Sequence, residues 1–118
     1  MITVGQLVEW VKKHRGDKVF RGYTDEELVA SISEAANENT LFYEASEDGT
    51  IHGMVYAMKM EKIKVLFVQE NLATDIKILG RIARLGRAMY PGYRIEAQRH
   101  GKLRKFNTDK LYTKLGAI

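Results

Sequence analysis

The stretch from Ile63 to Tyr90 constrains the fold of this chain most, because its hydrophobic period changes partway along. Residues 63–68 are mostly β-branched or large and apolar, which is typical of a strand buried on both faces. From Ile76 onward, apolar residues recur at three- and four-residue steps, which is typical of one face of a helix. We therefore predict a central strand that leads through a short polar loop into a helix.

The loop between this strand and this helix is the first candidate binding site. Thr74 or Asp75 can cap the start of the helix, and Pro91-Gly92 ends it. The start of a helix exposes backbone N–H groups and carries the positive end of the helix dipole. Because both features favour an anion, the pattern predicts a phosphate site at the carboxyl end of the strand.

Capping and turn signals place the elements that come earlier. Thr3 and Gln6 form a capping-box pattern that opens a helix ending near residues 15–16, and residues 24–27 open a second helix that ends at 37–39. Strands are expected over 40–45 and 50–60, joined by a tight turn at Asp48-Gly49. Gly53, inside the second of these strands, indicates a bulge or a close backbone approach.

The chain after the basic helix is expected to add one strand and one helix. Residues 93–97 alternate weakly as a strand would, and 100–102 are expected to be loop. Asn107 or Thr108 can cap a last helix that ends at Gly116. The predicted order is α-α-β-β-β-α-β-α in a single domain, residues 1–118. The fold class is α/β (α+β), with a mixed sheet that is antiparallel at first and then has a parallel crossover.

Composition excludes several classes of site. The 118 residues contain no cysteine, which excludes disulfides, thiolate catalysis and cysteine-bound zinc. The three histidines show no ligand spacing, so no metal is expected. No apolar run is long enough to span a bilayer and no secretory segment follows Met1, so we expect no membrane association and a cytoplasmic location.

The net charge of +4 is concentrated in the C-terminal half. Between residues 77 and 105 only Glu96 opposes nine basic residues, which indicates an anionic partner. The alternative is that these side chains form an ordinary solvated surface. The residues proposed to face such a partner are Lys77, Arg81, Arg84, Arg99, Lys102, Arg104 and Lys105.

Three stretches, in this order, resemble motifs of the GNAT N-acetyltransferase superfamily. Residues 47–53 resemble its second hairpin, and Lys64–Val68 followed by the basic helix resembles its central cofactor motif. Residues 111–117 resemble its last helix, in which Tyr112 stands four residues before a glycine. The resemblance covers residues 24–117 and implies a GNAT-like mixed sheet.

The resemblance also implies a cosubstrate and a site. In the family, acetyl-CoA lies along the central strand where that strand splays from its parallel neighbour. Carried over, this puts the pantetheine beside Phe67 and Val68, and Tyr112 becomes the acid that protonates the leaving thiolate. No base is assigned by the family pattern: Glu70, at the end of the central strand, is the candidate, and the alternative is that it is a solvated loop residue. Asn107 lies two residues nearer Tyr112 than the family's usual asparagine. The pyrophosphate is expected at the backbone of Ala73, Thr74, Asp75, Ile76 and Lys77.

Two departures from the family pattern qualify these expectations. Residues 72–77 contain no glycine, although a phosphate-binding backbone is usually glycine-rich. The family normally has two further strands after its last helix, and they help to build the pocket for the acceptor amine. Without them the sheet is expected to have an exposed edge, which invites pairing with a second copy of the chain.

Two functions follow as hypotheses. The first is an acyl-CoA-dependent N-acyltransferase that moves an acetyl group from acetyl-CoA to an amine. The second is a non-catalytic protein on the same fold, similar to short bacteriophage members. Its basic half would bind an acidic protein, nucleic acid or a virion partner, in the host cytoplasm or the virion.

Overall fold

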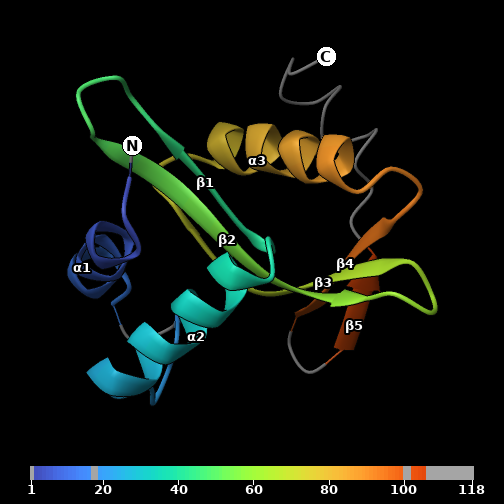
Figure 1. Cartoon of the computed structure of the whole chain (residues 1–118), viewed down its shortest axis with the longest axis horizontal. Coiled ribbons are helices and arrows are strands. Elements are labelled where there is room, and N and C mark those ends of the chain that lie inside the picture. Colours follow the sequence, from blue (N-terminus) through green and yellow to red (C-terminus); the bar gives the residue numbers. More distant parts are fainter. Residues whose placement is uncertain (1, 17–18, 100–101, 106–118) are drawn as a thin grey trace.

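The computed structural model describes residues 2–16, 19–99 and 102–105 (Figure 1). These residues form helices and strands in the order α-α-β-β-β-α-β-β. The elements are α1 (Val4–His14), α2 (Asp25–Asn37), β1 (Leu41–Ala45), β2 (Ile51–Met60), β3 (Val65–Ala73), α3 (Ile76–Met89), β4 (Arg94–Arg99) and β5 (Lys102–Lys105). No helix in this described part of the chain is both long and apolar enough to cross a membrane.

The strands form one mixed sheet in the order β1-β2-β3-β4-β5, so β3 lies at its centre. The pairs β1–β2, β2–β3 and β4–β5 are antiparallel, whereas β3 and β4 are parallel. The helix α3 supplies the crossover between the two parallel strands. The prediction of a central strand over residues 63–68 is confirmed from Val65 onward, whereas the polar loop expected after Val68 is wrong, because β3 continues to Ala73.

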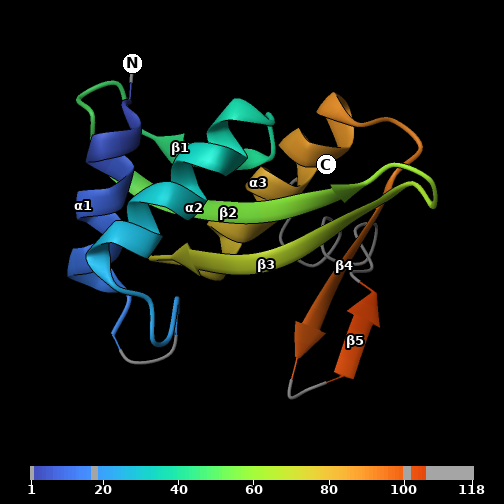
Figure 2. The ribbon, with the colours of Figure 1, turned by 60° about the horizontal axis from the view of Figure 1, so that its bottom comes forward.

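Helices cover both faces of the sheet, with α1 and α2 on one face and α3 on the other (Figure 2). The first face holds a cluster that includes Leu7, Leu28 and Met54. The second face holds a cluster that includes Phe42, Leu66 and Ile82. Buried residues on both sides explain why the sequence of β3 begins as an apolar run instead of an alternating one.

Local signals in the sequence placed the starts of α1 and α2 correctly. Thr3 and Thr24 each accept a hydrogen bond from the backbone N–H three residues later. The side-chain oxygens of Gln6 and Glu27 each accept a hydrogen bond from the backbone N–H of the capping threonine, which completes both capping boxes. These boxes satisfy N–H groups that would otherwise have no partner within the helix.

The end of the described chain differs from the prediction. The strand expected over 93–97 continues to Arg99, and Lys102–Lys105 forms a further strand, β5, in place of the expected end of the sheet. Four of the six residues that extend the sheet beyond the prediction, 98–99 and 102–105, are Lys or Arg, so no apolar alternation indicates a strand there. Backbone pairing between β4 and β5 joins them to the sheet. The helix predicted from residue 107 or 108 to 116 lies outside the described residues.

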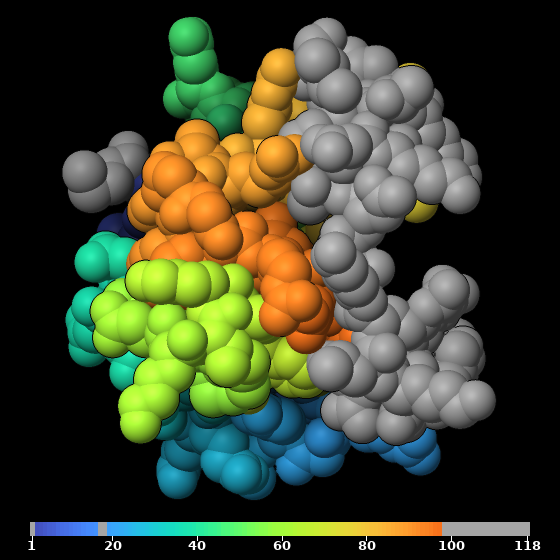
Figure 3. Space-filling view, turned by 90° about the vertical axis from the view of Figure 1, so that its right-hand side faces the viewer, coloured from blue at the N-terminus to red at the C-terminus, as the bar shows by residue number. Residues whose placement is uncertain are grey.

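Aromatic and cationic side chains tie the turn between β2 and β3 to the segment that follows α3. The backbone N–H of Arg94 donates to the carbonyl of Lys64 over 2.9 Å. The amine of Lys64 lies 5.3 Å from the ring centroid of Tyr93, and that of Lys59 lies 5.6 Å from the ring centroid of Tyr90. Figure 3 shows the two segments in contact at this end of the molecule.

Gly53 brings β2 and α3 close together. A Cβ atom at this position would stand 2.7 Å from Cγ2 of Ile78 and 3.0 Å from Cβ of Ala73. The register of β1 and β2 also shifts here, between Glu44 and Ala45. Both features that the sequence indicated for Gly53, a bulge and a close approach, are therefore present.

We expect Gly53→Ala to lower the free energy of unfolding by about 1–3 kcal/mol, because the added methyl group forces β2 and α3 apart. Gly86→Ala is the matched control, since its Cβ would meet Leu66 and Phe42 at ordinary distances of 3.8 and 3.9 Å. The control should be neutral or stabilising by up to about 1 kcal/mol, because alanine favours a helix more than glycine does. Urea unfolding measures the free energy of unfolding of both variants. Equal changes in the two would contradict the close-approach explanation.

Candidate functional site

The parallel strands β3 and β4 separate partway along their length. They pair from Val65 opposite Arg94 to Val68 opposite Ala97. Beyond that point β3 continues to Ala73 and β4 to Arg99, but the two strands no longer pair. Figure 2 shows the two ribbons diverging. The second half of β3 therefore has a partner on the β2 side and none on the β4 side among the described strands.

A bulge in β3 stands where this separation begins. Tyr56 of β2 pairs with Glu70 and Ala57 pairs with Val68, which leaves Gln69 as the extra residue. A bulge of this kind increases the local twist and re-aims the side chains that follow it. Before it, Val68 packs in the cluster beneath α3, whereas after it Leu72 packs against the cluster beneath α1 and α2.

Glu70 follows the bulge, two residues after the last pair between β3 and β4. It is half-buried and pairs across the sheet with Tyr56 of β2. Burial raises the pKa of the Glu70 carboxyl, and the backbone of Phe20 opposes this rise to a smaller extent. A carboxylate of raised pKa is better matched to proton transfer near neutral pH than an exposed one.

Tyr56 is the cross-strand partner of Glu70 and lies in a similar environment. Burial raises the pKa of its phenol, with further contributions from Tyr23 and from Glu34 and Glu38 of α2. A side-chain hydrogen bond with Ser31 opposes that rise. The cross-strand neighbour of Glu70 is thus itself near tyrosine and acidic side chains, and the sequence pattern alone did not bring these residues together.

The two residues expected beside the pantetheine lie directly before the opening. Phe67 is half-buried, and Val68 is 8% exposed within the α3 cluster. The Val68 side chain is therefore core.

The predicted phosphate site is largely satisfied by groups of the chain itself. The N–H of Thr74 donates to the carbonyl of His52 over 2.9 Å, and the N–H of Lys77 donates to the Asp75 carboxylate over 2.9 Å. The N–H of Ile78 donates to the carbonyl of Asp75. Asp75 is thus the N-cap of α3. A phosphate would have to displace its carboxylate, and the side chain of Ala73 lies against Gly53 on the sheet.

The basic residues predicted to face an anionic partner divide into two groups. Arg81 forms a bidentate ion pair with Glu44, with N···O distances of 2.5 and 2.9 Å, so its charge is offset within the molecule. Lys77 and Arg84 are exposed on α3. Arg99, Lys102, Arg104 and Lys105 lie on the β4–β5 pair. Tyr112 and Asn107 lie outside the described residues.

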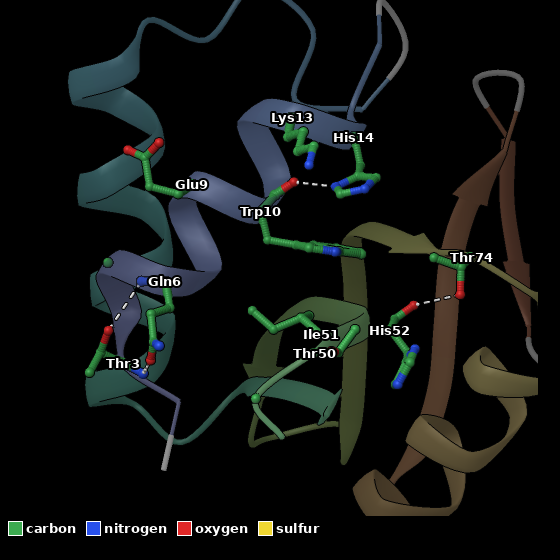
Figure 4. Close-up of a pocket in the computed structure, with 12 residues that line it drawn as sticks. Thr3, Gln6, Glu9, Trp10, Lys13, His14, Thr50, Ile51, His52 and Thr74 are labelled. Carbon is green, nitrogen blue, oxygen red and sulfur yellow. Dashed lines mark hydrogen bonds between the residues drawn. The ribbon is translucent and has the colours of Figure 1, made fainter. Parts of the chain in front are cut away.

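An open groove of about 900 Å³ was not anticipated from the sequence. It lies between α1 and the start of β2 and reaches Thr74 at the start of α3 (Figure 4). Trp10 and His14 stack along one wall, with ring centroids 4.9 Å apart, and His52 stands on the opposite side. In the sequence, only the helical spacing of Gln6, Trp10 and Lys13 indicated that these side chains share one side of α1. Within the described ranges, no three potential ligand side chains gather as they would around a metal ion.

Comparison with known proteins returned no match to this chain among protein-family models, curated proteins or solved structures.

Glu70→Gln should raise the melting temperature at pH 7. Because the folded-state pKa of Glu70 is raised, the native protein binds this proton more tightly than the unfolded chain does. Its contribution to stability is therefore full below the unfolded pKa and is lost as pH rises through the folded pKa. The advantage of the glutamine variant should vanish below about pH 4.

Thermal unfolding at the two pH values checks this expectation. Glu61→Gln, in the exposed turn between β2 and β3, is the matched control and should unfold like the wild type at both. A Glu70→Gln variant that is less stable than the wild type at pH 7 would contradict the burial of a charged carboxylate.

Proposed function

We propose that this protein is an acyl-CoA-dependent N-acyltransferase, which transfers an acetyl group from acetyl-CoA to an amine. The observation that carries the proposal is the separation of β3 from β4 directly after Val68, with the desolvated carboxylate of Glu70 at its start. This is the arrangement that the GNAT resemblance leads one to expect. We also propose a cytoplasmic location, where acyl-CoA is available.

The opening between the strands suits an elongated amide-bearing chain. Backbone N–H and C=O groups of β3 that face away from β2 need partners, because buried backbone groups are almost always hydrogen-bonded. The pantetheine arm of acetyl-CoA carries amides that can supply them in the manner of an added strand. In this proposal the backbone of residues 69–73 binds the pantetheine arm, and Phe67 and Val68 lie at one end of that binding site.

Proton transfer is assigned to two side chains. Glu70 accepts a proton from the acceptor ammonium, so that the free amine can attack the thioester carbonyl. Tyr112 donates a proton to the sulfur as the carbon–sulfur bond breaks, a role that rests on the resemblance alone. Positioning of the two reactants in one site supplies much of the rate enhancement, because the step becomes effectively intramolecular.

The start of α3 is the part of the proposed site that suits the pyrophosphate of acetyl-CoA least well. Its N–H groups suit a pyrophosphate, but the Asp75 carboxylate already accepts one of those hydrogen bonds and adds a negative charge. In this proposal Asp75 swings away when acetyl-CoA binds. The exposed Lys77 then supplies the compensating positive charge.

The satisfied start of α3 favours a second candidate, a non-catalytic protein on the same fold. With its amides occupied, α3 presents Lys77 and neighbouring basic residues without a phosphate pocket. An acidic protein, nucleic acid or virion partner then suits this surface better than a cosubstrate does. A second copy, paired through an edge of the sheet, remains part of either proposal.

Acetyl-CoA should raise the melting temperature, and Asp75→Asn should strengthen that effect. Asparagine still caps a helix but removes the charge beside the phosphate, so the Kd should fall about threefold to tenfold. Asp48→Asn, in the turn between β1 and β2, changes the net charge equally and should leave the Kd unchanged. No stabilisation by acetyl-CoA in either protein, together with salt-sensitive binding to nucleic acid, would replace the enzyme by the second candidate.

Glu70→Gln should lower kcat about 100-fold or more with a primary amine as acceptor, because glutamine cannot take the proton. Tyr112→Phe should lower kcat about tenfold or more, because it removes the acid that assists departure of the thiolate. Release of CoA measures both. Tyr93→Phe, directly before β4, is the control. Full turnover by the Glu70→Gln variant would exclude the base assigned here.

A further inference from the structure

The groove between α1 and the start of β2 has one aromatic wall. Trp10 and His14 lie one helical turn apart on α1, and their rings stack with an interplanar angle of 30°. The Nδ1 atom of His14 bonds to the carbonyl of Trp10 over 2.9 Å (Figure 4). Because a carbonyl can only accept, Nδ1 carries the hydrogen of this bond, which fixes the orientation of the imidazole. The wall is therefore formed by the helix itself, before any ligand binds.

The chain already uses most of the polar groups that line the groove. The hydroxyl of Thr74 donates to the carbonyl of His52 over 3.3 Å, and Nε2 of His52 bonds to the hydroxyl of Ser46. The side-chain oxygen of Gln6 accepts from the N–H of Thr3 over 2.7 Å. Within the described part of the chain, the amide nitrogen of Gln6 has no partner, so Gln6 offers the groove a donor.

Lys13 brings positive charge to the groove. Its side chain is exposed on α1, one turn after Trp10. Among the described residues, no carboxylate lies within ion-pair distance of its amine. Glu9 also lines the groove, but its carboxylate lies 3.5 Å from the amine of Lys12, and Figure 4 shows it directed away from the ring of Trp10. The groove therefore combines a flat apolar surface with an uncompensated cation.

We propose that this groove binds a small molecule in which a flat aromatic ring carries an anionic group. The ring stacks on Trp10, and Lys13 binds the anion through a charge-assisted hydrogen bond. Gln6 lies seven residues before Lys13, about 10 Å along the helix axis, and donates to an acceptor at the other end of the ligand. The volume of about 900 Å³ is in the range of small-molecule sites. A nucleoside phosphate and an aromatic carboxylate share this chemistry.

This site is separate from the one proposed for acetyl-CoA. The pantetheine site follows β3 beyond Val68, where the pairing with β4 ends. The groove is lined by α1 and by residues 49–52, and Thr74 is the residue that the two sites share. Binding in the groove therefore does not depend on acyl transfer.

Trp10 is the single tryptophan of the chain, so quenching of its fluorescence reports on the groove directly. In the full chain, AMP and benzoate should each quench Trp10 with a lower Kd than their neutral counterparts, adenosine and benzamide. Lys13→Gln should raise the Kd for AMP and benzoate about threefold to fivefold, because an exposed ion pair is lost. The same variant should leave the Kd for adenosine and benzamide unchanged, since these compounds carry no charge for Lys13 to bind.

Lys62→Gln, in the exposed turn between β2 and β3, is the matched control. It changes the net charge equally and should leave all four Kd values unchanged. A lower Kd for AMP than for benzoate would support the proposal and assign a nucleoside phosphate, whereas the reverse order would support it and assign an aromatic carboxylate.

Two results would overturn the inference. One is the absence of quenching by both anions at millimolar concentration, and the other is a Lys13→Gln variant that weakens charged and neutral compounds equally. Stabilisation by acetyl-CoA is measured separately. Its absence, together with normal quenching by AMP or benzoate, would remove the transferase and leave the groove as a binding site.

Discussion

The backbone pairing of β3 is the constraint on which the rest of the structure depends. This strand joins the antiparallel half of the sheet to the parallel half, and it carries the apolar residues that fill both faces. Its pairing with β2 runs almost its full length, whereas its pairing with β4 ends at Val68. Because backbone groups that lose one partner need another, the point where a central strand loses its neighbour is a natural place for a ligand.

Two local features beside that point are energetically unfavourable in themselves. Glu70 keeps a carboxylate half out of water, and Phe20 holds a left-handed backbone in the core. Neither improves stability, and the contacts that maintain them come from three different elements. Such unfavourable local features gather at functional sites in many proteins, where a fixed geometry matters more than a fraction of the total stability.

The helix α3 shows how one element serves two demands. Its apolar face lies so close to β2 that only glycine fits at position 53. A larger residue there would increase the distance between the helix and the sheet. Its first turn is closed by Asp75, which stabilises the helix in the absence of any ligand. The same carboxylate occupies the place that suits a phosphate. The helix is therefore stable on its own, and binding of an anion has to compete with its cap.

The sequence by itself determined the features that depend on residues near one another in the chain. These are the two capping boxes, a hairpin connection that contains Asp48-Gly49 but spans residues 46–50, the apolar run that became the central strand, and the need for glycine at position 53. Only the tertiary structure decided where β3 and β4 part, that Gln69 is bulged, that β5 joins the sheet, and that Tyr56 lies opposite Glu70. The reason is physical: caps, turns and periods are set over a few residues, whereas strand pairing and burial are settled between segments far apart in sequence. The surroundings of Glu70 depend on this second kind of contact, with Tyr56 on the neighbouring strand.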